Sequence, residues 1–228
     1  MTALTANLQA TNARIAAATA AAGRPAGAAR LIAVSKTFGA DRVVEAATAG
    51  QRAFGENYLQ EAVAKIDTLR AAVPDLEWHF IGPLQSNKTR PVAEQFDWVH
   101  CVDRLKIAER LSAQRPVDLP PLRVLLQVNI DDESSKSGVS PAEAPALARA
   151  IAQLPRLALQ GLMTIPRPAA GFEAQRTAFA ALRRLRDQIA ATGPALPELS
   201  MGMSSDLEAA IAEGATMVRV GTAIFGER

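Results

Sequence analysis

Lys36 is the side chain whose type and place in this sequence most directly suggest chemistry. It follows four apolar residues, Leu31–Val34, and then Ser35. Apolar walls beside such a lysine favour the neutral amine, the form that attacks a carbonyl group to make a Schiff base. A lysine at the end of a strand also readily extends its ammonium group into solvent. Position alone leaves both interpretations open.

Two segments in the last third of the sequence could together bind an anion. Ser200–Asp206 passes from a strand-like run through Gly202 into a helix-like run, and the start of a helix attracts anions. Arg219–Thr222 ends another strand-like run with Gly221 and a hydroxyl. Alone, Ser204 would suit helix capping and Gly221 a tight turn. At neighbouring strand ends, the two segments predict a phosphate site.

Arg219 lies inside the apolar run Met217–Val220. An unpaired buried charge is costly, so we expect this guanidinium group to have a partner. That partner is either a carboxylate in a structural ion pair or an atom of a ligand. The sequence leaves both open.

Other catalytic chemistries find little support. His79 and His100 are the only histidines, and no H-E-x-x-H pattern is present, so we expect them in core packing or ring stacking and predict no metal site. A G-x-S-x-G motif is absent, which argues against Ser-His-Asp catalysis. The polar stretch 129–138 lacks the spacing of an EF-hand and is expected to be a solvated or lid-forming loop.

Strand-like and helix-like segments alternate along the chain, which favours a parallel sheet with helical crossovers. The predicted strands are Leu31–Ser35, Ala53–Phe54, Trp78–Ile81, Trp98–Val102, Val124–Ile130, Leu157–Met163, Leu199–Met201 and Met217–Val220. The predicted helices between them are Asp41–Thr48, Leu59–Ala71, Asn87–Gln95, Leu105–Ala113, Pro141–Gln153, Phe172–Ala191 and Asp206–Ala212. Helix starts are expected at Asp41, Ser86, Asp103, Ser140 and Ser204 or Ser205.

This alternation fits an open doubly wound sheet or a closed barrel. No G-x-G-x-x-G follows the first strand, and the predicted strands number eight with short connections. We therefore predict an α/β fold, a single-domain (β/α)8 TIM barrel over residues 1–228, with an N-terminal helix at about residues 2–22. The length of 228 residues is close to that of a barrel with little decoration, roughly 250 residues.

Composition excludes several classes of protein. The 25 basic and 23 acidic side chains give a net charge of +2, which implies no nucleic-acid partner. Cys101 is the only cysteine, so no intrachain disulfide framework can form. No stretch of about 20 apolar residues suggests a membrane span, and no signal-peptide pattern follows the N-terminus. We expect a cytoplasmic globular protein without a membrane partner.

Motifs after residue 31 closely resemble one family, the pyridoxal 5′-phosphate (PLP) homeostasis proteins, also called the YggS/PROSC family of fold-type III, alanine-racemase-like barrels. The matching blocks occur in the order typical of the family and span nearly all of the chain after residue 31. They are AVSKT (33–37), FGENYLQEA (54–62), WHFIGPLQSNK (78–88), ESSKSG (133–138), GLMTIP (161–166), LSMGMSSDLEAAI (199–211) and VRVGTAIFGER (218–228).

The resemblance implies a cofactor site and assigns residues to it. Lys36 would hold PLP as a Schiff base, and Arg219 would face the pyridine nitrogen and keep it unprotonated. Phosphate would be bound by Ser204, Gly221 and Thr222. Asn57 would lie near the ring, and Met201, Met203 and His79 are carried over as pocket lining.

The resemblance also implies a role. We expect a protein of vitamin B6 homeostasis that binds PLP reversibly and buffers it or delivers it to PLP-dependent apo-enzymes, with no efficient catalytic activity and as a monomer. Alanine racemases need a second domain with a catalytic tyrosine, which we expect this chain to lack; its one tyrosine is Tyr58. The alternatives are a PLP-dependent racemase or lyase of low activity with Lys36 as its base, and a phosphosugar-binding barrel without PLP.

Overall fold

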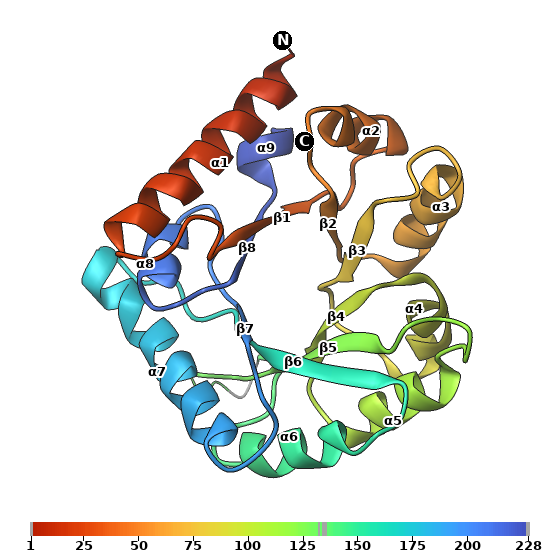
Figure 1. The fold of residues 1–228 in the computed structure, drawn as a ribbon, viewed down its shortest axis with the longest axis vertical. Coiled ribbons are helices and arrows are strands. Elements are labelled where there is room, and N and C mark those ends of the chain that lie inside the picture. The colour runs from red at the N-terminus through yellow and green to blue at the C-terminus, as the bar shows by residue number, and fades with distance from the viewer. Residues whose placement is uncertain (1, 132, 134–135, 227–228) are drawn as a thin grey trace.

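The computed structural model describes residues 2–131, 133 and 136–226. Its strands form a closed parallel barrel in which each strand pairs with the next and β8 pairs with β1, and Figure 1 shows the helices surrounding it. The strands are β1 (Arg30–Val34), β2 (Ala53–Glu56), β3 (Glu77–Phe80), β4 (Trp98–Val102), β5 (Leu122–Gln127), β6 (Leu157–Met163), β7 (Glu198–Ser200) and β8 (Met217–Val220). The predicted (β/α)8 barrel is confirmed. Part of the ESSKSG block (134–135) and the end of the VRVGTAIFGER block (227–228) lie outside the described residues.

Helices follow the strands along the chain and pack on the outside of the barrel. They are α1 (Ala3–Ala21), α2 (Ala40–Thr48), α3 (Leu59–Leu69), η1 (Ser86–Lys88), α4 (Thr89–Gln95), α5 (Leu105–Gln114), α6 (Ala144–Ala152), α7 (Phe172–Ala190), α8 (Leu207–Ala212) and α9 (Thr222–Phe225), of which η1 is a 3-10 helix. Within the described residues, each predicted helix has a counterpart. The short helix α9 was not predicted.

Helix α1 precedes the barrel and lies along the outside of α8 and α9, in the red and blue part of Figure 1. Its buried residues recur every three or four positions, at Leu4, Leu8, Thr11, Ile15 and Thr19, which places them on one face of the helix. The Asn7 side chain donates a hydrogen bond to the carbonyl oxygen of Ile224 in α9, and Arg14 pairs with Glu208 in α8. The first helix is thus fastened to the elements that follow β7 and β8.

Several predicted helix starts are wrong in detail. The N-cap residues of α2, α5 and α8 are Gly39, Arg104 and Asp206, and none of them accepts a side-chain capping hydrogen bond. Ser140 does accept a hydrogen bond from the backbone N–H of Glu143, but α6 itself begins at Ala144. The capping residue types therefore located the start of these helices to within a few residues. They did not identify which side chain, if any, accepts a hydrogen bond from the free backbone N–H groups.

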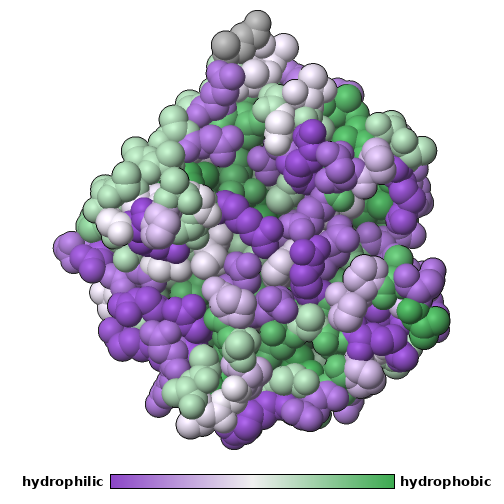
Figure 2. Space-filling view, in the orientation of Figure 1, coloured by the Kyte–Doolittle hydropathy of each residue, from purple (hydrophilic) through white to green (hydrophobic). Residues whose placement is uncertain are grey.

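The barrel is filled by side chains, as its continuous apolar strands require. All five residues of β4 are buried, although one of them is His100. Figure 2 shows hydrophilic side chains over the centre of the face turned to the viewer, with hydrophobic ones visible in recesses between them. No helix in the described part of the chain has the length and apolar character needed to cross a membrane.

Candidate functional site

A cavity of about 560 Å³ opens where β1, β2 and β8 end. This is the end of the barrel at which parallel α/β barrels carry their active sites. All six residues predicted for the cofactor site line it: Lys36, Asn57, Ser204, Arg219, Gly221 and Thr222. Met203 also lines the cavity, whereas Met201 and His79 do not and are buried in the core. The six residues predicted from the sequence therefore share one continuous surface.

Lys36 reaches this cavity because side chains alternate along β1 and beyond its end. Val34 and Lys36 both line the cavity, while Ser35 between them is buried on the other side, where its hydroxyl donates to Glu56 Oε1 at 2.6 Å. Within the described residues, the Lys36 ammonium group has no hydrogen-bond or ion-pair partner. It stands half-buried at the mouth of the barrel as an amine available to a ligand.

A buried ion-pair cluster fixes the backbone on both sides of Lys36. Lys65 in α3 donates to the carbonyl oxygen of Ser35 at 2.9 Å, to Glu56 Oε1 at 2.6 Å and to Glu61 Oε1 at 2.9 Å. Glu61 Oε1 also accepts the backbone N–H of Thr37 at 2.5 Å. Thr37 has φ of 68°, a conformation that a non-glycine residue keeps only when its surroundings enforce it.

Glu56 is fully buried, and its second oxygen, Oε2, is an unpartnered buried atom within the described residues. Burial raises the pKa of the Glu56 carboxyl group, against the charge and hydrogen bond of Lys65, which lower it. The cluster therefore holds its geometry at an electrostatic cost, which suits a role in placing the chain around Lys36.

Arg219 is buried and has no carboxylate partner among the described residues. Its Nη1 donates to Ser200 Oγ at 2.6 Å and its Nη2 donates to the carbonyl oxygen of Thr164 at 2.9 Å. Burial lowers the pKa of the guanidinium group to about 10, and the charge of Asp206 acts in the opposite direction, so Arg219 stays protonated at neutral pH. Of the two partners that the sequence left open, the carboxylate is wrong, because a hydroxyl and a backbone carbonyl take its place.

The two histidines lie in the barrel core, as predicted. The His79 ring is stacked on Trp98 with an interplanar angle of 7°, and His79 Nδ1 lies 2.9 Å from His100 Nε2. Burial lowers the pKa of His79 to about 4 and that of His100 well below its usual value. Within the described residues, no group of three or more His, Cys, Asp or Glu side chains could hold a metal ion.

Hydroxyl groups and a glycine form the other side of the cavity. Ser204 does not cap α8; instead the Asp206 carboxylate accepts the backbone N–H of Met203 at 2.6 Å. The sequence suggested that Thr222 ends β8, but in the structure it begins α9. At Gly221 a Cβ atom would lie 3.1 Å from the carbonyl oxygen of Val34, so the absence of a side chain keeps β8 and β1 close at the mouth.

Asn57 is shared between this cavity and its neighbours. A Cβ atom at Gly82 would lie 2.3 Å from the carbonyl oxygen of Asn57, so glycine there lets the two backbones touch. A smaller neighbouring cavity of about 270 Å³ is lined by Asn57 and by Lys136, whose ammonium group pairs with Asp131 at 3.1 Å.

These groups fit an aldehyde that carries an anion. An unpartnered amine can condense with the aldehyde, while Ser204 and Thr222 offer hydroxyl donors beside a close backbone approach at Gly221. Arg219 presents a fixed positive charge inside the same cavity.

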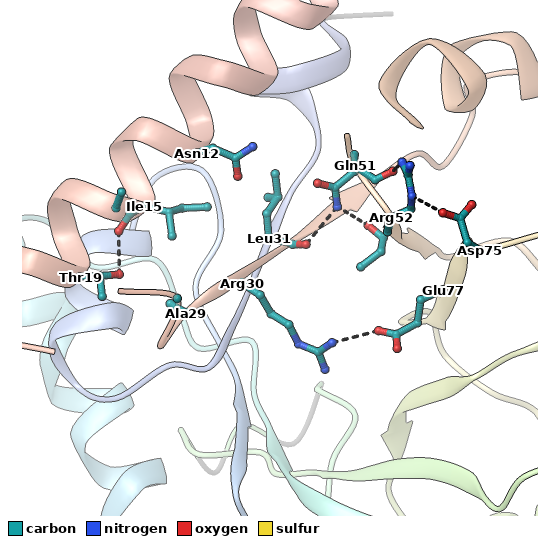
Figure 3. A pocket seen from close by; sticks show the side chains of 13 residues that line it. Asn12, Ile15, Thr19, Ala29, Arg30, Leu31, Gln51, Arg52, Asp75 and Glu77 are labelled. Atoms are coloured by element: carbon teal, nitrogen blue, oxygen red, sulfur yellow. Dashed lines mark hydrogen bonds and ion pairs between the residues drawn. The ribbon is translucent and has the colours of Figure 1, made fainter. Parts of the chain in front are cut away.

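A second cavity, of about 570 Å³, lies at the opposite end of the barrel between α1 and the starts of β1, β2 and β3. Figure 3 shows Arg30 and Glu77 pointing toward each other there, and Arg52 paired with Asp75. Arg30 Nη1 lies 3.0 Å from Glu77 Oε1. Its charged side chains are thus engaged with one another, and it is remote from Lys36.

Comparison with known proteins agrees with the geometry. Residues 6–228 match the family described as alanine racemase, N-terminal domain. The pyridoxal phosphate homeostasis protein of Pseudomonas aeruginosa is 59% identical over 100% of this chain and 97% of its own length. The chain belongs to the pyridoxal phosphate homeostasis protein family.

Two further proteins extend the comparison. The Escherichia coli K12 protein of that name is 54% identical, over 97% of this chain and 95% of its own length. PipY of Synechococcus elongatus PCC7942, solved with PLP bound, superposes with a TM-score of 0.80 at 40% identity, covering 93% of this chain and 100% of PipY.

Two sets of side chains around the site were not predicted from the sequence. One is the cluster of Glu56, Glu61 and Lys65, for which the i, i+4 spacing of Glu61 and Lys65 on α3 was the available signal. The other consists of Glu77, His79, His100 and Ser200, which are joined by hydrogen bonds inside the barrel. Glu77 and His79 lie two residues apart in one strand, and therefore on the same face, which was the corresponding signal.

Proposed function

We propose that this protein binds PLP reversibly through Lys36 and thereby buffers the vitamin or delivers it to PLP-dependent apo-enzymes. When bound, the cofactor supplies an aldehyde, which condenses with an amine to a Schiff base and water, and water reverses the step. The observation that carries the proposal is the Lys36 amine, which has no partner among the described residues and lies in the same cavity as Arg219, Ser204, Gly221 and Thr222. The PLP found in the PipY structure supports it.

Each residue has a separate task in this proposal. The hydrogen bonds that join Ser35 to Glu56 and to Lys65 hold the end of β1 so that Lys36 projects into the cavity. Arg219 donates a hydrogen bond to the pyridine nitrogen and keeps it unprotonated, which weakens the ring as an electron sink. Ser204, Gly221 and Thr222 bind the phosphate through hydroxyl and backbone N–H groups, and Asn57 lies beside the ring.

The side chains that line the cavity favour a protein that carries PLP over an enzyme that uses it. Among the described residues that line it, the titratable side chains are Lys36 and Arg219. Lys36 could serve as one base, but exchange of a proton on the opposite face needs a second group with a suitable pKa. A racemase or lyase of low activity is the alternative, and deuterium uptake from solvent into a panel of amino acids measures it.

The proposal also includes the domain organisation, oligomeric state, cellular compartment and partners of the protein. We place one domain over residues 1–228, acting as a monomer in the cytoplasm, with PLP and apo-enzymes as partners. Sedimentation of the PLP-loaded protein alone, and then mixed with a PLP-free enzyme, measures the oligomeric state and any direct contact.

Absorption spectra test the proposal. Wild-type protein with PLP should show the visible band of a Schiff base, and Lys36→Ala should not show it after washing. Lys106→Ala, which removes an exposed lysine on α5, is the matched control and should keep the band. Borohydride reduction followed by peptide mass spectrometry should place the added pyridoxyl group on Lys36. A wild-type spectrum without the band, or a label on another lysine, would contradict the proposal.

A further inference from the structure

A chain of buried hydrogen bonds leads from Arg219 into the interior of the barrel. Arg219 Nη1 lies 2.6 Å from Ser200 Oγ, which lies 2.9 Å from His100 Nδ1. His100 Nε2 lies 2.9 Å from His79 Nδ1, and His79 Nε2 lies 2.7 Å from Glu77 Oε1. These side chains come from β8, β7, β4 and β3 and form one continuous path.

The path crosses the barrel rather than following its wall. His100 in β4 and Ser200 in β7 belong to strands that are not neighbours, so their contact spans the interior. Both histidines and Ser200 have no exposed surface. At the far end, Glu77 lies among Arg30 and Arg123, each 3.0 Å away, beside the cavity of Figure 3.

With both imidazoles neutral, the two ends of the path fix the direction of every hydrogen bond. Arginine can only donate and an ionised carboxylate can only accept. Ser200 Oγ accepts from Arg219, and its O–H group donates to His100 Nδ1. His100 then carries its proton on Nε2 and donates to His79 Nδ1, and His79 donates from Nε2 to Glu77. In this arrangement each neutral imidazole carries its single proton on Nε2.

The charges that face the path agree with this assignment. Burial lowers the pKa of both histidines. For His79 the hydrogen bond and charge of Glu77 act against burial, and the charges of Arg30 and Arg123 act with it. For His100 the charges of Arg219 and Arg30 also lower the pKa. Burial alone would raise the pKa of Glu77, but the hydrogen bond from His79 and the charges of Arg123 and Arg30 lower it to about 2. Neutral histidines between an ionised glutamate and a protonated arginine are the state expected at neutral pH.

We propose that Glu77, His79, His100 and Ser200 are positioning residues that fix the orientation of Arg219 at the cofactor ring from the opposite end of the barrel. The inference rests on the proposed function, in which Arg219 faces the pyridine nitrogen. Its consequence is that the hydroxyl of Ser200 and the charge of Glu77 influence PLP affinity and the absorption of bound PLP, although neither residue lines the cofactor cavity.

The first test uses the PLP-free protein and is independent of the cofactor. His79 and His100 are the only histidines, so long-range proton–nitrogen correlation spectra contain two imidazoles. Both should show a neutral ring with the proton on Nε2 at neutral pH. A proton on Nδ1 of either ring, or a doubly protonated ring, would overturn the assigned direction.

The second test removes one hydroxyl with shape held constant. Ser200→Thr adds a methyl group and keeps the hydroxyl. Ser200→Val has the shape of the threonine variant but carries a methyl group where that variant has the hydroxyl. The dissociation constant of PLP should be about tenfold higher for the valine variant than for the threonine variant, because Arg219 and His100 each lose a partner. The absorption maximum of bound PLP should also shift in the valine variant alone.

Matched controls separate positioning from general loosening. Ser112→Ala removes another buried hydroxyl, bonded to the carbonyl oxygen of Pro155, and should leave PLP affinity unchanged. Glu77→Gln should weaken PLP binding less than Ser200→Val, since its amide oxygen still accepts from His79. Glu198→Gln, whose carboxylate lies 3.8 Å from Arg30 at the same end of the barrel, should have no effect.

The outcomes distinguish this inference from the proposed function. Equal PLP affinity and absorption for the Ser200 pair, or an equal loss in Ser112→Ala, would overturn the positioning role while Lys36 still forms its Schiff base. Absence of that Schiff base in the wild type would instead remove the proposed function, and the histidine spectra would still report on the path.

Discussion

The ammonium group of Lys65 lies 2.9 Å from the carbonyl oxygen of Ser35, the residue immediately before Lys36. This contact brings Lys65 close to the backbone beside Lys36, but the two lysines differ in their hydrogen-bond and ion-pair partners. Lys65 is buried and bonded to a carbonyl and two carboxylates, whereas Lys36 has no partner in the described part of the chain. The partnered lysine fixes the backbone, and the unpartnered one remains free to react.

Replacing Lys65 should therefore cost both stability and cofactor binding. Lys65→Met leaves Glu56 buried without its cation, and we expect a loss of about 3–5 kcal/mol in the free energy of unfolding. PLP binding should weaken because the Ser35–Thr37 backbone loses its support. Urea unfolding and PLP titration measure the two effects.

The double variant Lys65→Met with Glu56→Gln should recover part of the stability, since it removes the uncompensated charge. Lys106→Met on the exposed face of α5 serves as the control and should change the free energy of unfolding by less than about 0.5 kcal/mol. Equal stability of Lys65→Met and Lys106→Met would contradict the role assigned to the cluster.

His79 should make the protein less stable as the solution becomes acidic. Its pKa falls from 6.5 to about 4 on folding, so the unfolded chain binds a proton in this interval that the folded protein does not. The contribution is fully present above pH 6.5 and is lost as the pH falls toward about 4, with a maximum of about 3 kcal/mol. Urea unfolding across this interval measures the slope.

A His79→Gln variant isolates that contribution. The raised pKa values of Glu56, Asp97 and Asp103 act in the opposite direction, because protonation of these acids favours the folded state. The difference in slope between wild type and variant removes this background. Parallel stability curves for the two proteins between pH 4 and 6.5 would show that His79 is not buried in its neutral form.

Gly221→Ala should weaken PLP binding more than it weakens the fold. The new Cβ atom would lie 3.1 Å from the carbonyl oxygen and 3.3 Å from the Cβ atom of Val34, which must then shift at the mouth of the cavity. We expect the dissociation constant of PLP to rise about tenfold, as small displacements of binding groups have large effects.

Gly27→Ala provides the opposite case. Gly27 has φ of +79° and open space around its Cα, so alanine costs backbone energy, about 1–2 kcal/mol, without a clash at the site. It should lower the melting temperature and leave PLP affinity intact. If the two alanine variants showed the same ratio of stability loss to affinity loss, Gly221 would have no special role at the cavity.

Thr222→Val should reduce the preference for PLP over pyridoxal, which lacks the phosphate. A hydrogen bond to a charged phosphate is lost while the shape of the side chain is kept, and we expect the ratio of the two affinities to fall roughly tenfold. Thr48→Val, on the exposed end of α2, is the matched control. An unchanged ratio in Thr222→Val would place the phosphate elsewhere in the cavity.

The barrel and the wall of its cavity were predictable because they depend on local pattern. Apolar runs ended by Lys36, Asn57 and Thr222 mark strand ends, and parallel strands bring such ends to one edge. The boundaries were less certain. Val128 leaves β5 for an isolated bridge with Val139, so the predicted strand 124–130 continued too far.

Contacts across the barrel could not be predicted in the same way. Ser200 and His100 are far apart in the sequence and belong to non-adjacent strands, so their hydrogen bond depends on the diameter and closure of the barrel. The partner of Arg219 was expected to be a carboxylate or a ligand for this reason. Periodicity reports which face a residue occupies, but it does not report which side chain lies across the interior.

The fastening of α1 to α8 and α9 has a consequence for synthesis on the ribosome. Residues 3–21 emerge early, yet their partners lie in residues 207–225, and β1 waits for β8 before the barrel closes. A nascent chain that has emerged only through β7 has Lys36 but lacks Arg219, Gly221 and Thr222. The unfinished chain therefore carries the amine proposed to bind the aldehyde, but not the groups proposed to retain its phosphate.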